Sequence, residues 1–310
     1  MIRALLIAGP TASGKSALAL ALAQKFGASI VNADSMQVYR DLAILTARPS
    51  REEEAKAAHF LFGEVDGATN FSVALWLDRA RAIIARERRP LIFVGGTGLY
   101  FRALTEGLSD LPAVSADIRE AVRGRAKDAA TPRLHAELSQ KDPATAANLR
   151  PTDRQRILRA LEIFEASHRP LASMQGARSA PALKRGDWRG VFLAPQREAL
   201  RLRIDHRFDA MLRAGALDEV AALKARSLDP ALPVMRAHGV PHLIAHLAGR
   251  LSLQEATELS KRDTRQYAKR QFTWARHQMP DFAWVPPERA EDLAASALAA
   301  ETLGDPAARA

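Results

Sequence analysis

The first residues with an evident chemical purpose lie near the start of the chain, in the segment Gly9-Pro10-Thr11-Ala12-Ser13-Gly14-Lys15-Ser16. This segment satisfies the pattern G-x-x-x-x-G-K-[ST] of a phosphate-binding loop, or P-loop. In such a loop, backbone N–H groups and the N-terminus of the following helix attract an anion, and the lysine adds a full positive charge. We predict that residues 9–16 bind a phosphorylated ligand, with Lys15 on the phosphates and Ser16 as a ligand of a divalent cation.

The residues on either side of this loop predict the elements that it requires. Residues 4–8 (Ala-Leu-Leu-Ile-Ala) form a short apolar run that is typical of a buried strand. Residues 17–23 alternate alanine and leucine, which are strong helix formers. A strand, a glycine-containing loop and a helix in this order give the pattern its physical meaning, because the helix N-terminus then points at the ligand.

Two further predicted strands bring polar residues to the same place. Residues 29–33 lead into Asp34 and Ser35, and residues 91–94 (Leu-Ile-Phe-Val) lead into Gly95-Gly96-Thr97-Gly98. Strands that are separated by helical crossovers form a parallel sheet covered on both faces. Ligands of such sheets bind beyond the carboxyl ends of the strands, and the P-loop, Asp34 and Thr97 all belong to that edge.

The crossover before the last of these strands is predicted with particular clarity. An amphipathic helix should run from Ser72 to Arg89, with Ser72 as its N-cap and Pro90 at its end. The stretch 51–58 is acidic and is expected to form an exposed helical turn or loop.

Asp34 is the acidic residue that the strand edge places near the P-loop. A carboxylate close to Lys15 stays ionised and can accept a proton from a nucleophile, although the same residue type also caps loops. The strand 91–94 ends in Gly95-Gly96, where GTPase-type and motor-type P-loop proteins place a metal-binding aspartate. This ending favours a kinase-like or transferase-like site over a molecular switch.

The middle of the chain changes character. From about residue 111 the strand signal disappears, and residues 115–175 predict several helices, of which 153–165 is the best. Residues 175–190 are polar and contain glycine, which is typical of a linker. We expect residues 112–185 to form a helical insertion domain, and residues 1–111 and 186–310 to form the P-loop catalytic core.

The last part of the chain returns to the α/β pattern. A strand at 190–194 should precede an arginine-rich helix at 197–213, and helices are expected at 216–226 and 252–277. Residues 282–285 predict a final edge strand, and the chain from 288 is alanine-rich and helical. The predicted fold class is α/β, with a P-loop NTPase-like parallel sheet flanked by helices and an all-helical insertion domain.

Composition sets the broad class. The chain has 310 residues with 45 Lys and Arg against 35 Asp and Glu, a net charge of +10, and no cysteine. The positive excess attracts polyanions such as nucleic acid, although a basic surface without a partner has the same composition. No apolar run approaches the roughly 20 residues that span a bilayer. We expect a soluble, cytoplasmic protein without membrane contact, and a monomer.

Five separated motifs resemble the bacterial tRNA dimethylallyltransferases, also called tRNA isopentenyltransferases. The resemblance runs from residue 1 to about residue 285, and five motifs in order are far more specific than a P-loop alone. The motifs are GPTASGKS (9–16), NADSMQVY (32–39), VGGTGLY (94–100), DRQRILRALE (153–162) and KRQFTWAR (269–276).

The resemblance implies a reaction. These enzymes transfer a dimethylallyl group from dimethylallyl diphosphate to N6 of the adenosine immediately 3′ of the anticodon in tRNA. The leaving group is diphosphate, which would explain a P-loop without a hydrolysis apparatus. By resemblance, Thr11 to Ser16 cradle the diphosphate, Ser16 binds Mg²⁺ and Asp34 is the general base. Thr97 would orient the target base, and Arg207 would contact the diphosphate, with Arg203 as the alternative on the same helix.

The resemblance also implies a tRNA-binding set around the anticodon stem-loop, whose target adenine must leave its stack. Basic residues beside groups that stack or hydrogen-bond support this reading. The residues so assigned are Asp34, Ser35, Met36, Gln37, Thr97, Arg119, Gln155, Arg156, Ile157, Leu158, Arg159, Arg236, Lys269, Arg270, Gln271, Phe272, Thr273, Trp274, Ala275 and Arg276.

One segment departs from the family. Residues 236–242 read Arg-Ala-His-Gly-Val-Pro-His, which keeps the glycine but lacks the aromatic residue and the second arginine expected there. Only Arg236 is therefore assigned to RNA. His238, His242 and His246 recur at four-residue spacing, so they predict either a metal site on one helix face or histidines that face RNA or solvent.

Two other classes of function remain open from the residues alone. A small-molecule P-loop kinase would use ATP as the donor and Asp34 to deprotonate a hydroxyl group. A non-catalytic RNA-binding protein would use the loop for regulation. The basic insertion argues against the kinase, and Asp34 at the strand edge argues against the pure binder. Whether ATP also binds the loop stays undecided.

Overall fold

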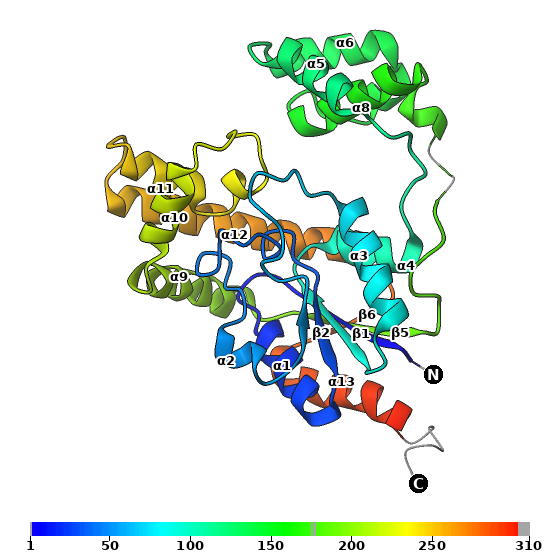
Figure 1. The fold of residues 1–310 in the computed structure, drawn as a ribbon, viewed down its shortest axis with the longest axis vertical. Helices are drawn as coiled ribbons and strands as arrows, with labels where there is room; N and C mark the ends of the chain where they lie inside the picture. The colour runs from blue at the N-terminus through cyan, green and yellow to red at the C-terminus, as the bar shows by residue number, and fades with distance from the viewer. Residues whose placement is uncertain (1, 175, 177, 303–310) are drawn as a thin grey trace. The chain divides into compact units, whose positions relative to one another are not determined.

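The computed structural model describes residues 2–174, 176 and 178–302, and these fall into two compact units (Figure 1). One unit combines the chain up to residue 105 with the chain from residue 181, and the other comprises residues 106–180. The expected boundaries at 112 and 185 lie a few residues C-terminal to these.

A six-stranded sheet forms the centre of the first unit. Its strand order is β3-β2-β4-β1-β5-β6, and every neighbouring pair is parallel. The parallel α/β architecture predicted from the sequence is therefore confirmed, with 282–285 as an edge strand. The strands are β1 (Ala4–Ala8), β2 (Ser29–Asn32), β3 (His59–Phe60), β4 (Leu91–Gly95), β5 (Trp188–Leu193) and β6 (Phe282–Val285).

Helices link the strands of this unit and cover both faces of the sheet. In the described part of the chain, none of them is long and apolar enough to cross a membrane. They are α1 (Lys15–Phe26), α2 (Arg51–Glu54), α3 (Val73–Arg86), α4 (Gly98–Glu106), α9 (Arg197–Arg213), α10 (Ala216–Ala225), the 3-10 helix η2 (Val234–Arg236), α11 (Val240–Leu247), α12 (Leu253–Gln278) and α13 (Pro287–Thr302).

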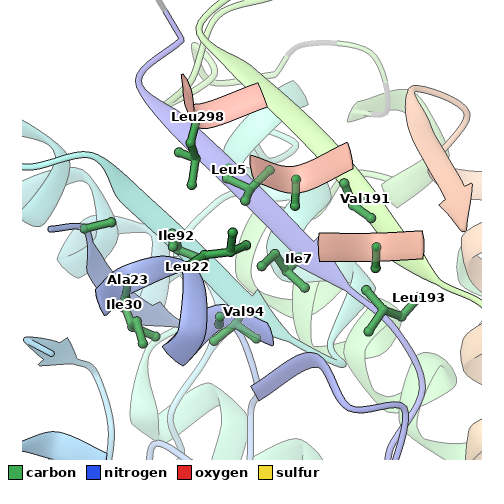
Figure 2. Close-up of a cluster of buried hydrophobic side chains, with 14 residues drawn as sticks. Leu5, Ile7, Leu22, Ala23, Ile30, Ile92, Val94, Val191, Leu193 and Leu298 are labelled. Atoms are coloured by element: carbon green, nitrogen blue, oxygen red, sulfur yellow. The ribbon is translucent and has the colours of Figure 1, made fainter. Parts of the chain in front are cut away.

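One face of the sheet packs against α1 and α13. Side chains that alternate along the strands, such as Leu5 and Ile7 of β1, point into this layer, where they meet Leu22 of α1 and Leu298 of α13 (Figure 2). These side chains are almost completely buried. The layer fixes α1 against β1, and it thereby fixes the loop between them.

The opposite face packs against α3, α4 and α12. Trp76 of α3 is fully buried, donates from Nε1 to the carbonyl oxygen of Asn32 at 2.8 Å, and stacks on Tyr100 of α4 with ring centroids 4.2 Å apart. Phe192 of β5 meets Phe272 of α12 edge to face at 5.7 Å. The long helix α12 therefore runs across the face where β1 and β5 lie, close to the carboxyl ends of the strands.

The second unit is all-helical, as the sequence predicts for this region. Its core joins the apolar faces of its longer helices and includes Leu138, Ile157 and Leu161. Glu162 is 2% exposed, and its Oε1 accepts a hydrogen bond from Arg123 Nε at 2.9 Å. The elements are α5 (Ala116–Ala126), α6 (Thr131–Lys141), α7 (Pro143–Ala147), α8 (Arg154–Ser167) and the 3-10 helix η1 (Leu171–Met174).

The structure corrects the sequence-based elements at several points. Strand β3, helix α4 and helix α11 carry no separate prediction, because each is short and begins beside glycine, proline or polar residues. Strand β5 begins at Trp188, inside the segment 175–190 that predicts a linker. Residues 175 and 177 of that segment lie outside the described residues. The amphipathic helix with Ser72 as its N-cap is confirmed, and Ser72 Oγ accepts from the N–H of Leu75.

Candidate active site

The P-loop has the backbone shape of an anion cradle. Ala12 and Gly14 have positive φ values of 61° and 93°, which turn successive N–H groups toward one side of the loop. Gly14 is the N-cap of α1 and makes no side-chain cap hydrogen bond, so the first N–H groups of the helix stay available for a ligand. Ser13 Oγ is buried and has no hydrogen-bond partner among the described residues. These groups together suit a phosphate.

Lys15 is held inside this cradle. Its Nζ donates to the carbonyl oxygen of Pro10 at 3.1 Å. Burial lowers the pKa of Lys15 to about 8, the carboxylate of Asp34 acts in the opposite direction, and the guanidinium of Arg207 lowers the pKa further. An anion between these two cations would favour the charged form of Lys15 and act against the shift.

A cavity of about 490 Å³ opens over the P-loop, and we call it the phosphate cavity. Residues 12–16 form its base, and Arg203 and Arg207 of α9 contribute positive charge from the opposite side. Arg207 also donates from Nη2 to Thr11 Oγ1 of the loop. The structure therefore brings both candidate arginines to the phosphates' expected place, and Arg207 is the one bonded to the loop.

Asp34 lies two residues after the end of β2 and is fixed by its neighbours. Asn32 Oδ1 accepts from the N–H of Asp34 at 2.7 Å, and Asn32 Nδ2 donates to the carbonyl oxygen of Asp34 at 2.9 Å. Asp34 Oδ1 accepts from the N–H of Met36 at 2.9 Å. Asp34 therefore does cap a turn, but this bond engages one carboxylate oxygen, and its other oxygen, Oδ2, faces Gly96.

Thr97 is joined to the segment that carries Asp34. The N–H of Thr97 donates to the carbonyl oxygen of Ala33 at 3.2 Å, and Thr97 Oγ1 accepts from the N–H of Ser35 at 2.9 Å. A side chain at Gly95 would come within 2.0 Å of the carbonyl oxygen of Ala33. Glycine at position 95 is what lets the ends of β2 and β4 approach so closely.

Helix α12 contributes the buried amide side chain of Gln271 to the site. Gln271 Oε1 accepts from the N–H of Thr11 at 3.0 Å, and Gln271 Nε2 donates to the carbonyl oxygen of Gly96 at 2.8 Å. One side chain therefore bridges the P-loop and the glycine-rich loop after β4. Gln271 was assigned to tRNA by resemblance, and in the structure both polar ends of its side chain are engaged inside the protein.

A second cavity, of about 180 Å³, contains Asp34, and we call it the Asp34 cavity. Its walls come from segments far apart in the sequence and are largely apolar and aromatic, with Met36, Phe208 and Tyr267 among them. Arg207 lines this cavity as well as the phosphate cavity. Burial lowers the pKa of Arg207, and Asp34 opposes this effect. The two cavities therefore meet at one half-buried cation.

A third cavity, of about 260 Å³, lies beside the glycine-rich loop after β4. It is lined by Thr97, Gly98, Arg270 and Trp274, and it shares Tyr267 with the Asp34 cavity. Burial and the negative charge of Asp34 raise the pKa of Tyr267, so this hydroxyl keeps its proton over the physiological pH range. The three cavities line one edge of the sheet.

The predicted RNA residues of the first unit lie on or next to this edge. Ser35, Met36 and Arg236 line the Asp34 cavity. Gln37 instead donates from Nε2 to the carbonyl oxygens of Thr46 and Ala47. Along α12, the side chains alternate between solvent and the interior. Lys269, Arg270, Thr273 and Arg276 are exposed, Phe272 and Trp274 are half-buried, and Gln271 and Ala275 are buried.

The predicted RNA residues of the second unit lie on α5 and α8. Gln155, Arg156 and Arg159 are exposed, and Arg119 is half-buried. Ile157 is fully buried and Leu158 packs against the same core, so these two side chains serve the packing of the unit. The exposed face of α8 is therefore the part of this motif that can meet a polyanion.

The three histidines of the departing segment do not converge. His242 Nε2 pairs with Asp263 Oδ2 at 2.8 Å, His246 Nδ1 lies 3.0 Å from the carbonyl oxygen of Leu251, and His238 packs on Tyr267 with centroids 4.5 Å apart. In the described part of the chain, no three His, Cys, Asp or Glu residues are arranged to hold a metal ion. The metal alternative is not supported. Gly239 is required for another reason, because its φ is 94° and a side chain there would press on Phe208 and Leu45.

The residues present fit Mg²⁺ in one particular way. Mg²⁺ in phosphate sites is held by one or two protein oxygens together with phosphate oxygens and water. Ser16 supplies such an oxygen, because it is exposed and lines the phosphate cavity. A cation here would rest on Ser16 and on the ligand's own oxygens.

Tyr267, which lines the site, and Glu219, which binds a segment that lines it, are residues that the sequence reasoning missed. Tyr267 precedes Gln271 by one helical turn, so the same face of α12 carries both, and that spacing was a usable signal. Glu219 lies on α10, and its carboxylate binds the backbone of residues 43–45. A pairing between positions so far apart leaves no local trace in one sequence.

The fold and the site together define the structural class of the protein. A parallel sheet with a P-loop between β1 and α1, and with further site residues after β2 and β4, is a P-loop NTPase-like α/β protein with a helical insertion. A family model described as IPP transferase matches residues 37–278, and one described as isopentenyl transferase matches residues 2–64.

Relatives and solved structures agree with these matches. The chain is 64% identical over 294 residues to a tRNA dimethylallyltransferase of Methylocella silvestris, covering 94% of this chain and 97% of that protein. It is 60% identical over 298 residues to a tRNA dimethylallyltransferase of Beijerinckia indica, covering 95% of this chain and 99% of that protein. A tRNA isopentenylpyrophosphate transferase structure from Bacillus halodurans has a TM-score of 0.68 at 29% identity, covering 98% and 99%. A eukaryotic dimethylallyltransferase acting on tRNA has a TM-score of 0.79 at 25% identity, covering 97% and 79%.

The chain belongs to the tRNA dimethylallyltransferase family, so the family predicted from the five motifs is confirmed. At the level of the family it is a prenyltransferase that modifies tRNA.

Proposed function

We propose that this chain transfers the dimethylallyl group of dimethylallyl diphosphate to N6 of the adenosine immediately 3′ of the anticodon in tRNA, and releases diphosphate. The observation that carries the proposal is the meeting of two different cavities at Arg207. One is a cationic cradle for phosphates, and the other is a largely apolar chamber that contains a carboxylate. A diphosphate ester with a short hydrocarbon tail needs both kinds of surroundings next to each other.

The chemistry at the junction can be written with its atoms balanced. The N6 nitrogen of adenine attacks the carbon that bears the diphosphate, a C–N bond forms, and the C–O bond to diphosphate breaks with its electron pair on oxygen. Asp34 receives the proton that leaves N6. Lys15, Arg207 and the N–H groups of the P-loop stabilise the charge that builds up on the departing diphosphate, and their effect is larger in the transition state than in the ground state.

Mg²⁺ held by Ser16 would add positive charge to the same diphosphate when bound. The protein's own share of the work is to hold the donor and to exclude water from it. Lys15 and Arg207 are half-buried cations whose pKa values are lowered by burial, so an anionic ligand favours their charged forms. The empty site therefore attracts the anionic donor.

The acceptor must bring an extruded base to Asp34. Thr97 and Ser35 are hydrogen-bonded to each other beside Asp34, and Tyr267 offers an aromatic face in the same cavity. The exposed Lys269, Arg270 and Arg276 on α12 supply phosphate contacts that need no sequence information. The exposed face of α8 is proposed to add further contacts to the anticodon stem-loop.

The deciding experiment follows a labelled prenyl group. The protein is incubated with Mg²⁺, dimethylallyl diphosphate labelled in its hydrocarbon part, and a tRNA transcript with adenosine 3′ of the anticodon. Label should enter the RNA as N6-dimethylallyladenosine, and a transcript with guanosine at that single position is the matched control. Failure to label the adenosine transcript, together with turnover of ATP on a small metabolite, would support the kinase alternative and contradict the proposal.

A further inference from the structure

The segment between Asp34 and α2 separates the two cavities. Met36, Leu45 and Thr46 line the Asp34 cavity, and Ala47 and Arg48 line the phosphate cavity. The segment contains turns and one isolated bridge, between Tyr39 and Val65. Backbone N–H groups outside regular structure must find other partners when they are shielded from water. The shape of this wall therefore depends on side chains that bind its backbone.

Glu219 of α10 is the main such side chain. Its Oε1 accepts from the N–H of Ala43 at 2.5 Å and from the N–H of Ile44 at 2.9 Å, and its Oε2 accepts from the N–H of Leu45 at 2.9 Å. Three consecutive N–H groups thus converge on one carboxylate. Hydrogen bonds to an ionised acceptor are about twice as strong as neutral ones. The three residues cannot shift separately without losing one of these bonds.

The same part of the chain holds the wall at a second point. Arg226, the residue after α10, pairs with Asp41 and, at 2.7 Å, with Asp66. On the inner side, Gln37 Nε2 donates to the carbonyl oxygens of Thr46 and Ala47 at 3.0 and 2.9 Å. Gln37 binds Thr46 and Ala47 themselves, whereas Glu219 binds the three residues just before them, of which Leu45 also lines the Asp34 cavity.

We propose that Glu219 is a positioning residue for the transfer reaction. It fixes residues 43–45, and through them the adjoining Thr46 and Ala47, as the shared wall of the two cavities, so it sets where the substrates lie against Asp34 and the P-loop without touching either substrate. This inference rests on the proposed function. Misplacing reacting groups by about 1 Å costs on the order of 100-fold in rate, so a residue that fixes this wall has a large effect from outside the site.

Two substitutions of Glu219 test the proposal, and a neighbour serves as the control. Glu219→Gln keeps the size of the side chain but replaces one acceptor oxygen by a donor group, and Glu219→Ala removes all three bonds. Asp218→Asn makes the same change of charge at an exposed carboxylate on the same turn of α10. The kcat/KM for both substrates is measured per folded molecule, together with Tm and the hydrogen exchange of the amides of residues 43–45.

Glu219→Gln is expected to lower kcat/KM by roughly 10-fold and Glu219→Ala by roughly 100-fold. Amide exchange at residues 43–45 should speed up in the same order, while Asp218→Asn behaves as wild type. Faster exchange with unchanged kcat and KM would overturn the positioning role, and so would a lowered Tm with wild-type kcat/KM in the folded fraction. If the wild-type protein itself transfers no prenyl group, the proposed function fails first, and the exchange result still reports whether Glu219 holds the wall.

Discussion

The two cavities that meet at Arg207 both have walls from distant segments, but they differ in how the groups that face the ligand are supplied. The base of the phosphate cavity is one unbroken stretch, residues 12–16, shaped by its own glycine and by the start of α1. The Asp34 cavity takes its walls from residues as distant as Thr11, Asp34, Arg207 and Tyr267. A site built locally depends on backbone shape, whereas an assembled site depends on tertiary contacts such as those of Gln271. The two cavities should therefore respond differently to substitution.

The sharpest test of the contrast lies in the Asp34 cavity. Asp34→Asn keeps an oxygen that can accept from the N–H of Met36 but cannot take a proton from the acceptor. We expect kcat to fall by about 10² to 10⁴-fold, the usual contribution of a general base, with tRNA affinity nearly unchanged. Single-turnover transfer and filter binding of tRNA measure the two quantities.

Asp34→Ala separates the two roles of this residue. It removes the turn cap as well as the base, so it should match the Asn variant in turnover and lose about 1 kcal/mol more of the free energy of unfolding. A collapse of tRNA binding in the Asn variant would mean that Asp34 acts as a binding group rather than as the base.

In the phosphate cavity the expected effect is on the diphosphate. Lys15→Met should weaken the stabilisation of the leaving group by roughly 10² to 10³-fold in kcat/KM, as the loss of one preorganised donor does elsewhere. The variant should leave tRNA affinity unchanged, because Lys15 lines the phosphate cavity and not the Asp34 cavity. A Lys15→Met variant that loses tRNA affinity instead would erase the distinction between the two cavities.

The same lysine predicts a pH dependence. Burial lowers the pKa of Lys15 to about 8, so in the free protein the ammonium loses its proton as the pH rises through about 8. Affinity for inorganic diphosphate should therefore be constant below that pH and fall above it, by up to about tenfold per pH unit. Titration calorimetry between pH 7 and pH 9.5 is the measurement. Lys15→Arg keeps its charge throughout, so its profile reports the titration of diphosphate and of other groups, and the loss due to Lys15 is the difference between the two profiles. An equal fall in both proteins would assign the titration to another group.

Substitution of Gln271 tests the contact that joins the P-loop to the glycine-rich loop after β4. Gln271→Leu removes the bonds to Thr11 and Gly96 and leaves a partly buried N–H and a partly buried carbonyl oxygen without them. Each unsatisfied group costs about 1–3 kcal/mol, so Tm should drop measurably, and kcat should fall about tenfold. Loss of tRNA affinity alone, with normal Tm and kcat, would instead support the direct tRNA contact inferred from the family.

The smallest effect is expected from a surface cation. Arg156→Gln on the exposed face of α8 should raise the KM for tRNA a few-fold and reduce the slope of log affinity against log salt by about 1. Arg185 is the control, since it is exposed and precedes β5, which places it at the sheet edge opposite the site. Equal effects of the two substitutions would mean that only net charge matters.

The sequence predicted the features that depend on neighbouring residues and missed those that depend on tertiary contacts. The P-loop, Asp34 at the end of β2 and Thr97 after β4 follow from short patterns in which one neighbour determines the next. The parallel sheet follows from alternating strand and helix signals. The bond from Gln271 to Thr11, and the bonds from Glu219 to residues 43–45, join positions that only the folded chain brings together. Nothing in the local pattern marks them.

The short elements show a second limit. Strand β3 has two residues, His59–Phe60, and its existence depends on pairing with β2 rather than on its own pattern. Helix α4 begins at Gly98, a residue that usually signals a loop. In both cases tertiary packing overrides local propensity.

The burial of Lys15 and Arg207 beside each other also affects the protein between turnovers. Two half-buried cations lie close together with Asp34 as the nearby negative charge, so the empty protein carries an electrostatic penalty that an anion relieves. Binding of an anion at this place should therefore make the folded protein more resistant to heat. Inorganic diphosphate alone should raise the melting temperature, as any ligand of the native state does. Diphosphate that stays bound after turnover would therefore also protect the resting enzyme against thermal unfolding.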